Sequence, residues 1–188
     1  NYKVFSELNN VAKEQNIGRE AMGRLDQTRG NEIFIGSNTE KVVRTSDVPV
    51  LVIKGQNSNF TIRNILFACS YSEDMIVAYK NVKLMAEKFS AKLKLVYINT
   101  PYQDFLSTPE AENRIAKFML KAGDTKSKVE VYNDHSVEVG ILNFSKTEDF
   151  DLLALPTHGR KGLSHFLLGS IGEDIANKAG LPVMTFKI

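Results

Sequence analysis

The segment 155–170 combines residue types that could bind a phosphate group. It reads Leu155-Pro156-Thr157-His158-Gly159, then nine residues, then Gly169-Ser170. Glycines let backbone N–H groups approach an anion, and the N-terminus of a helix adds the positive end of its dipole. Ser170 would add a hydroxyl donor, and Arg160 and Lys161 could add positive charge near the outer phosphates. The pattern predicts an anion site if a strand precedes it and a helix starts at Gly169.

Blocks of apolar residues predict those elements. Short apolar runs indicate buried strands, and apolar residues three or four apart indicate helices. The expected strands are 65–68, 93–98, 129–132, 152–155 and 182–186, and the expected helices end near 90 or cover about 110–122, 137–144 and 169–179. Strands that alternate with helices imply parallel pairing and right-handed crossovers. We therefore expect an α/β fold with a five-stranded parallel, doubly wound open sheet over residues 60–188, with the strand near Ile65 at its centre.

The start of the first helix and the position of the ligand follow from the same pattern. Ser70 and Glu73 have the spacing of a capping box, with a serine at the cap and a glutamate three residues later. In a doubly wound sheet the ligand lies at the carboxyl ends of the strands, where the strand order reverses. The loops after Ala68, Ile98 and Leu155 are therefore expected to line the crevice.

Part of the chain is repeated. Residues 33–54 align without a gap to residues 166–187, and six of the 22 positions are identical. The identical pairs are Gly36/Gly169, Ser37/Ser170, Glu40/Glu173, Pro49/Pro182, Val50/Val183 and Lys54/Lys187. The chain is therefore expected to carry the C-terminal portion of one repeat in residues 1–55 and a complete second repeat in residues 60–188. Val48 to Ile53 is the expected last strand of the first repeat, and the sequence around Ala21 is too polar for a central strand.

Composition excludes several classes of protein. Hydrophobic residues make up 43% of the chain and charged residues 24%, as in ordinary globular domains. The net charge of +2 and the absence of a Lys/Arg block argue against a nucleic-acid partner. No apolar run is long enough for a membrane helix, and the start resembles no signal peptide. The chain opens at Asn1 rather than Met, which suggests a fragment, and the single Cys69 favours a cytoplasmic location.

At this point the second repeat resembles the universal stress protein family over about residues 60–188. The family's nucleotide-binding members carry Gly-two-Gly-nine-Gly-Ser/Thr, which here is Pro156-x-x-Gly159-x9-Gly169-Ser170. The Thr157-His158-Gly159-Arg160 run and Pro182-Val183 are also similar, and the two copies resemble the family's tandem members. The resemblance implies a nucleotide site made by Ala68, Ser70, Tyr97, Pro156, His158, Gly159, Arg160, Gly169, Ser170 and Ile171.

The chain also departs from the family pattern. The first glycine is Pro156, which lacks a backbone donor, and the acidic residue that helps to fix adenosine in the family is Ser70. In the first copy, Asp26 stands where an anion would approach. We therefore expect ATP to bind weakly in the second repeat and not at all in the first, with no other cofactor.

Three functions are weighed against each other. The leading interpretation is a non-enzymatic stress-response protein with a degenerate nucleotide site, which acts through unidentified protein partners. It would pair through Val48–Ile53 and Pro182–Phe186, antiparallel, with each other or with a second copy. The alternatives are an ATP-binding stress protein with slow hydrolysis and a small electron-transfer or nucleotide-dependent enzyme on a similar sheet, such as a flavoprotein. No metal site is expected, because the histidines lack Cys or carboxylate neighbours at ligand spacing, and Cys69 is expected in the core or crevice wall.

Overall fold

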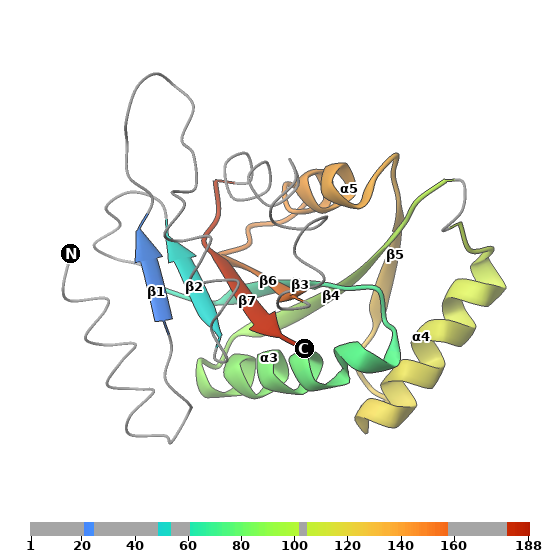
Figure 1. Cartoon of the computed structure of the whole chain (residues 1–188), viewed down its shortest axis with the longest axis horizontal. Helices are drawn as coiled ribbons and strands as arrows, with labels where there is room; N and C mark the ends of the chain where they lie inside the picture. Colours follow the sequence, from blue (N-terminus) through green and yellow to red (C-terminus); the bar gives the residue numbers. More distant parts are fainter. Residues whose placement is uncertain (1–20, 25–48, 54–60, 102–104, 158–179) are drawn as a thin grey trace.

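The computed structural model of the chain describes residues 21–24, 49–53, 61–101, 105–157 and 180–188. The strands of this part form one sheet in the order β1-β2-β7-β6-β3-β4-β5, and the helices lie above and below it (Figure 1). The strands are β1 (Ala21–Arg24), β2 (Val50–Ile53), β3 (Asn64–Ala68), β4 (Lys92–Asn99), β5 (Val129–Asn133), β6 (Leu152–Thr157) and β7 (Val183–Lys187). The helices are η1 (Glu73–Met75), a single 3₁₀ turn, then α3 (Ile76–Lys88), α4 (Thr108–Ala122) and α5 (Val137–Phe144).

The five strands from β3 to β7 form the predicted parallel sheet. β3 is central, because it pairs in parallel with β4 on one side and with β6 on the other. β5 and β7 extend the two sides, also in parallel. The expected central strand and doubly wound order are therefore confirmed. The helix predicted over 169–179 lies outside the described residues.

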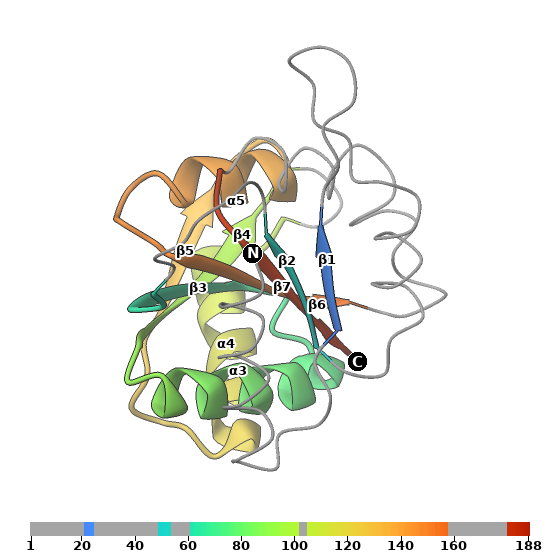
Figure 2. The same cartoon turned by 90° about the vertical axis from the view of Figure 1, so that its left-hand side faces the viewer.

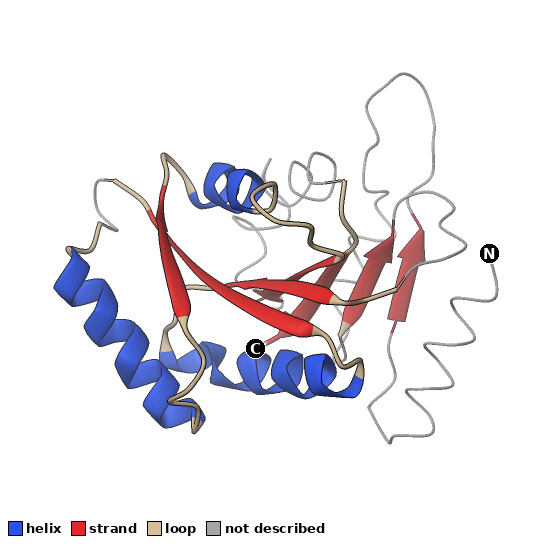
Figure 3. Ribbon diagram, turned by 180° about the vertical axis from the view of Figure 1, so that it is seen from behind, coloured by secondary structure: helices blue, strands red, loops and turns tan. Residues whose placement is uncertain are grey.

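Helices cover both faces of this sheet. α3 and α4 lie on one face and α5 on the other, as Figures 1 and 3 show from opposite sides. Alternate residues of β3 divide between two cores: Ile65 and Phe67 pack toward α3, and Leu66 and Ala68 toward α5. α5 packs closely against β4 at Gly140, because a side chain at this position would collide with Ile98.

The two copies of the repeated strand are neighbours in the sheet. β2 pairs antiparallel with β7, with Val50 opposite Thr185 and Val52 opposite Val183. β1 then adds to the free side of β2 in parallel (Figure 2). The prediction of antiparallel pairing between these strands is confirmed, and it occurs within one chain. β1 (Ala21–Arg24) is the edge strand on this side of the described sheet.

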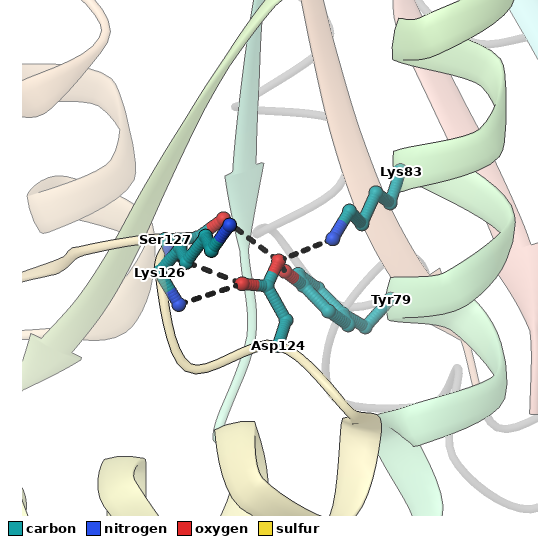
Figure 4. Close-up of polar contacts among 5 residues, drawn as sticks. All are labelled: Tyr79, Lys83, Asp124, Lys126 and Ser127. Atoms are coloured by element: carbon teal, nitrogen blue, oxygen red, sulfur yellow. Dashed lines mark hydrogen bonds and ion pairs between the residues drawn. The ribbon is translucent and has the colours of Figure 1, made fainter.

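A buried carboxylate joins α3 to the turn after α4 (Figure 4). Asp124 is 5% exposed and accepts hydrogen bonds from Tyr79 Oη at 2.7 Å and Lys83 Nζ at 2.5 Å. It also accepts from the backbone N–H groups of Lys126 and Ser127 and from Ser127 Oγ. Gly123, at φ +77°, ends α4 in the left-handed conformation that turns the chain toward this carboxylate. The cluster is a structural link between the two helices on this face.

Candidate functional site

A cavity of about 340 Å³ opens at the carboxyl ends of β3 and β4. This is the point where the strand order reverses, because the chain leaves β3 toward β4 on one side and β6 lies on the other. The described lining residues are Ala68, Cys69, Ser70, Tyr97, Ile98, Thr100, Leu106, Arg114, Val137 and Ile141. We call this cavity the crevice. Its volume and mainly apolar walls are those of a small-molecule site.

The turn after β3 shapes one side of the crevice. Tyr71 is 1% exposed and takes a positive φ of 53°, so the backbone bends sharply after Ser70. Its ring packs edge-on against Tyr97, with centroids 6.3 Å apart, and against Phe118 at 5.1 Å. Burial of this ring thus sets the direction of the turn and leaves Ser70 exposed at the rim of the crevice.

The capping box predicted at Ser70 and Glu73 is wrong. η1 begins at Glu73 with Ser72 at its N-cap and no side-chain cap, and the Ser70 and Ser72 hydroxyls share a hydrogen bond of 2.7 Å. Glu73 pairs instead with Lys121 of α4. The burial of Tyr71 fixes the backbone conformation after Ser70, and this conformation prevents the capping box that the Ser-x-x-Glu spacing predicted.

A capping box of the same spacing does form before α4. Ser107 donates to Glu110 from its backbone N–H at 2.9 Å and from its hydroxyl at 2.5 Å. These bonds lower the pKa of the Glu110 carboxyl. The Ser-x-x-Glu spacing at 107–110 was present in the sequence and would have located the start of this helix.

A buried amide holds the loop before α4 against the crevice. Asn99 is 5% exposed, donates to the Leu106 carbonyl at 3.0 Å and accepts from the Leu106 N–H at 3.0 Å. It also donates to Asn133 Oδ1 at 2.9 Å, which ties the ends of β4 and β5 together. Leu106 is thereby fixed as one wall of the crevice. Sequence reasoning missed Asn99, since the pairing joins residues that are distant along the chain.

Cys69 lines the crevice as expected, but it is not a reactive thiol. It is half-buried, and its sulfur accepts a hydrogen bond from the Tyr71 N–H at 3.4 Å. Burial raises the pKa of the thiol well above its ordinary range, which outweighs the opposite effect of that hydrogen bond. The sulfur is therefore protonated at neutral pH and is a poor nucleophile.

The part of the chain that the structure describes holds no group of three or more His, Cys, Asp or Glu side chains that could hold a metal ion. Nor is any described helix both long and apolar enough to cross a membrane.

The structure places four of the ten predicted site residues. Ala68, Ser70 and Tyr97 come together as lining residues of the crevice. Pro156 lies buried in β6, where it is paired with Phe186 of β7, and it is not among the described lining residues. The other six lie outside the described residues, and they are His158, Gly159, Arg160, Gly169, Ser170 and Ile171.

A comparison with known families identifies the family of this chain. The sequence model of the universal stress protein family matches residues 61–187, which include the whole five-stranded parallel sheet. The chain belongs to the universal stress protein family.

Individual relatives agree. A universal stress protein of Synechocystis is 27% identical over 158 residues, covering 81% of this chain and 52% of the relative. One from Methanocaldococcus jannaschii is 26% identical over 157 residues, covering 66% of this chain and 94% of the relative. The chain thus spans about half the length of the Synechocystis relative.

Solved structures share the fold. A universal stress protein from Archaeoglobus fulgidus superposes with a TM-score of 0.65 at 19% identity, over 95% of this chain and 64% of that one. One from Pseudomonas aeruginosa described as a putative universal stress protein gives 0.68 at 17% identity, over 94% and 66%. A universal stress protein in complex with cAMP gives 0.50 at 16% identity, over 67% of this chain and 97% of that one.

Sequence reasoning also missed a charged residue of the crevice. Arg114 projects from α4 and lines the crevice together with Ser70. It lies 44 positions from Ser70 along the chain, so no local motif connects the two. The Ser107 cap fixes where α4 begins, and the position of Arg114 in that helix was the sequence signal that could have identified it.

Proposed function

We propose that this universal stress protein is a non-enzymatic stress-response protein that binds an adenine nucleotide weakly in the crevice and acts through protein partners. The observation that carries the proposal is a cavity of about 340 Å³ at the switch point of the sheet, with Ser70 at the rim where the resemblance places a carboxylate. Apolar walls of this kind suit a flat purine ring, and few polar groups are available to orient it.

The polar groups at the rim favour weak binding. The Ser70 hydroxyl already shares a hydrogen bond with Ser72, and a hydroxyl lacks the charge of a carboxylate. Losing one charged hydrogen bond costs about 1.5–3 kcal/mol, which is roughly 10- to 150-fold in affinity. Pro156 has no N–H to offer a phosphate. Counted from a micromolar site, these losses place the expected dissociation constant for ATP roughly in the upper micromolar to millimolar range.

The described walls of the crevice also favour a binding role over catalysis. Their hydroxyl and thiol groups have no His, Asp or Glu among the other described lining residues to act as a general base. Asp151 lies at the amino ends of the strands, opposite the crevice. Its carboxylate accepts hydrogen bonds from the backbone N–H groups of Arg63 and Asn64 at 2.9 and 2.8 Å. That carboxylate is committed to holding the start of β3.

Partner binding includes self-association in this proposal. β2 and β7 each have a neighbour on both sides within the chain. A second copy could therefore use these strands only by exchanging the β2–β7 pairing between the two chains. Exchange of identical elements is a low-cost route to a dimer. Light scattering, before and after refolding at high concentration, would detect this form.

Mass spectrometry and calorimetry test the nucleotide proposal. Gently purified protein is examined for retained ATP or flavin and then titrated with ATP and with cAMP, since cAMP is the ligand named for one protein of the same fold. Val137→Phe fills the crevice from α5 and should abolish binding. Val139→Phe is the matched control, because Val139 is 41% exposed and does not line the crevice.

The outcomes separate the candidate functions. Weak binding that is lost only in Val137→Phe supports the proposal. Tight ATP binding with slow hydrolysis of ATP to ADP would favour a competent ATP-binding protein instead, and retained flavin would favour a flavoprotein. Binding that both substitutions leave unchanged would place the ligand elsewhere and overturn the assignment of the crevice.

A further inference from the structure

Three residues form the rim between the crevice and a second, more open hollow. The outer hollow, of about 590 Å³, lies between the 70–73 turn and α4. Ser70, Leu106 and Arg114 line both spaces. The guanidinium of Arg114 and the hydroxyl of Ser70 therefore belong to the same rim, and a ligand in the crevice that reaches this rim meets both.

The crevice side of the rim carries a positive charge. Arg114 is the sole formally charged side chain among the described residues that line the crevice, and it forms no ion pair with a described residue. Of the acidic neighbours in the outer hollow, Glu73 pairs with Lys121, whereas Glu110 accepts hydrogen bonds from the neutral Ser107 and keeps its negative charge. Lys117 adds a further cation to the outer hollow. The rim is thus built to attract an anion.

The strand order says which end of a ligand would meet this charge. Arg114 lies on α4, which follows β4, whereas β6 lies on the other side of β3. A phosphate chain that runs toward the end of β6 leads away from Arg114. The anion at Arg114 must therefore belong to the nucleoside end of the ligand, near the ribose.

We infer that the crevice prefers an adenine nucleotide whose phosphate is esterified to the 2′ or 3′ oxygen of the ribose, with that phosphate against Arg114. The inference rests on the proposed nucleotide site. A carboxylate at the ribose end binds free hydroxyls, whereas an arginine there accommodates a ribose phosphate, the same exchange that separates the two nicotinamide dinucleotides in related sheets. This rim has Ser70 in place of the carboxylate and carries Arg114. It therefore matches the arginine type, which accommodates a ribose phosphate. The planar guanidinium can also hold a phosphate through two parallel hydrogen bonds.

Calorimetry with four probes tests this preference. The probes are adenosine, 5′-AMP, 3′-AMP and 2′-AMP, titrated into the full chain. We expect 3′-AMP or 2′-AMP to bind about five- to tenfold more tightly than 5′-AMP, as one charge-assisted contact near solvent would allow. Arg114→Gln should remove this preference, so that 5′-AMP and its isomers bind with similar affinity. Arg114→Lys should restore part of it.

Lys117→Gln is the matched control, since it removes the same charge one helical turn away and lines the outer hollow but not the crevice. It should leave the preference intact. If 5′-AMP binds as tightly as its isomers, or if both glutamine variants reduce binding equally, this inference is wrong while the nucleotide site stands. If adenosine and all three nucleotides fail to bind, the proposed function and this inference fall together.

Discussion

The Tyr79 hydroxyl donates a 2.7 Å hydrogen bond to Asp124, and both side chains are buried. The two residues are 45 positions apart and belong to α3 and to the turn after α4. Their contact fixes how the two helices pack on one face of the sheet. Because α4 carries Arg114 and Phe118, the position of this helix also sets one wall of the crevice.

Loss of the Asp124 carboxylate should destabilise the fold. In Asp124→Asn, an amide N–H₂ would face donors from Tyr79, Lys83 and Ser127, so the buried cluster would be left with unmatched groups. We expect a loss of about 1.5–3 kcal/mol in the free energy of unfolding, the cost of a charged hydrogen bond, because Lys83 is partly exposed and can be hydrated. Urea unfolding followed by circular dichroism measures it. Asp149→Asn, on an exposed turn, is the control and should change stability little.

The same carboxylate should make stability depend on pH in the acid range. Burial alone would raise the pKa of Asp124, but hydrogen bonds from Lys83, Tyr79 and Ser127 outweigh it and lower the pKa well below its ordinary value. The resulting stability is present above the unfolded pKa of about 3.9 and is lost as pH falls below it toward the folded pKa. Unfolding curves between pH 6 and 2.5 should show this loss. A wild-type slope no steeper than that of Asp124→Asn would contradict it.

Restoring the family pattern should strengthen ATP binding. Ser70→Asp returns a carboxylate to the rim, and Pro156→Gly returns a backbone donor. Together they should lower the dissociation constant for ATP by roughly tenfold or more, as expected for a recovered charged hydrogen bond. Gly169→Val, at a glycine that the family pattern assigns to the phosphate site, should abolish what binding remains. Isothermal titration of the three variants decides, and no gain from the double substitution would mean that the site is misassigned.

Cys69 should react slowly with alkylating reagents. Because burial raises the pKa of its thiol, the reactive thiolate is scarce at pH 8. We expect iodoacetamide to modify Cys69 at least about tenfold more slowly than free cysteine, whose pKa is about 8.5, and at an ordinary rate in urea. Mass spectrometry follows the reaction at this single thiol. Native labelling as fast as free cysteine would show that the sulfur is accessible and ionised.

Asn99 should control the order of the loop beside the crevice. Asn99→Ala removes the hydrogen bonds to both backbone groups of Leu106 and the one to Asn133. Leu106 would then be held less firmly, so its amide should exchange with deuterium faster while exchange in β3 stays slow. Asn81→Ala, on the exposed side of α3, serves for comparison. Equal exchange at Leu106 in the wild type and in Asn99→Ala would argue that the loop is held by other contacts.

The sequence by itself determined the order of the elements. Each strand from β3 to β7 was visible as an apolar run, and each described helix of more than one turn as a 3.6-residue period, because these patterns report burial over a few neighbouring residues. The terminal position of β2 and β7 in their repeats, together with the resemblance to the family's dimers, predicted their antiparallel pairing. These observations left open whether the two strands would pair within one chain or between two, since both arrangements cover the same apolar edges.

Tertiary structure decided the details of the crevice. Ser70 and Ser107 stand in the same Ser-x-x-Glu spacing, yet only Ser107 caps a helix, because the buried ring of Tyr71 fixes the backbone after Ser70. Arg114 lines the crevice, and Asn99 holds the lining residue Leu106, from elements that meet only in the folded chain. Local patterns are set by neighbours within a turn or two, whereas the charge and shape of a site depend on contacts between distant segments, which packing alone brings together.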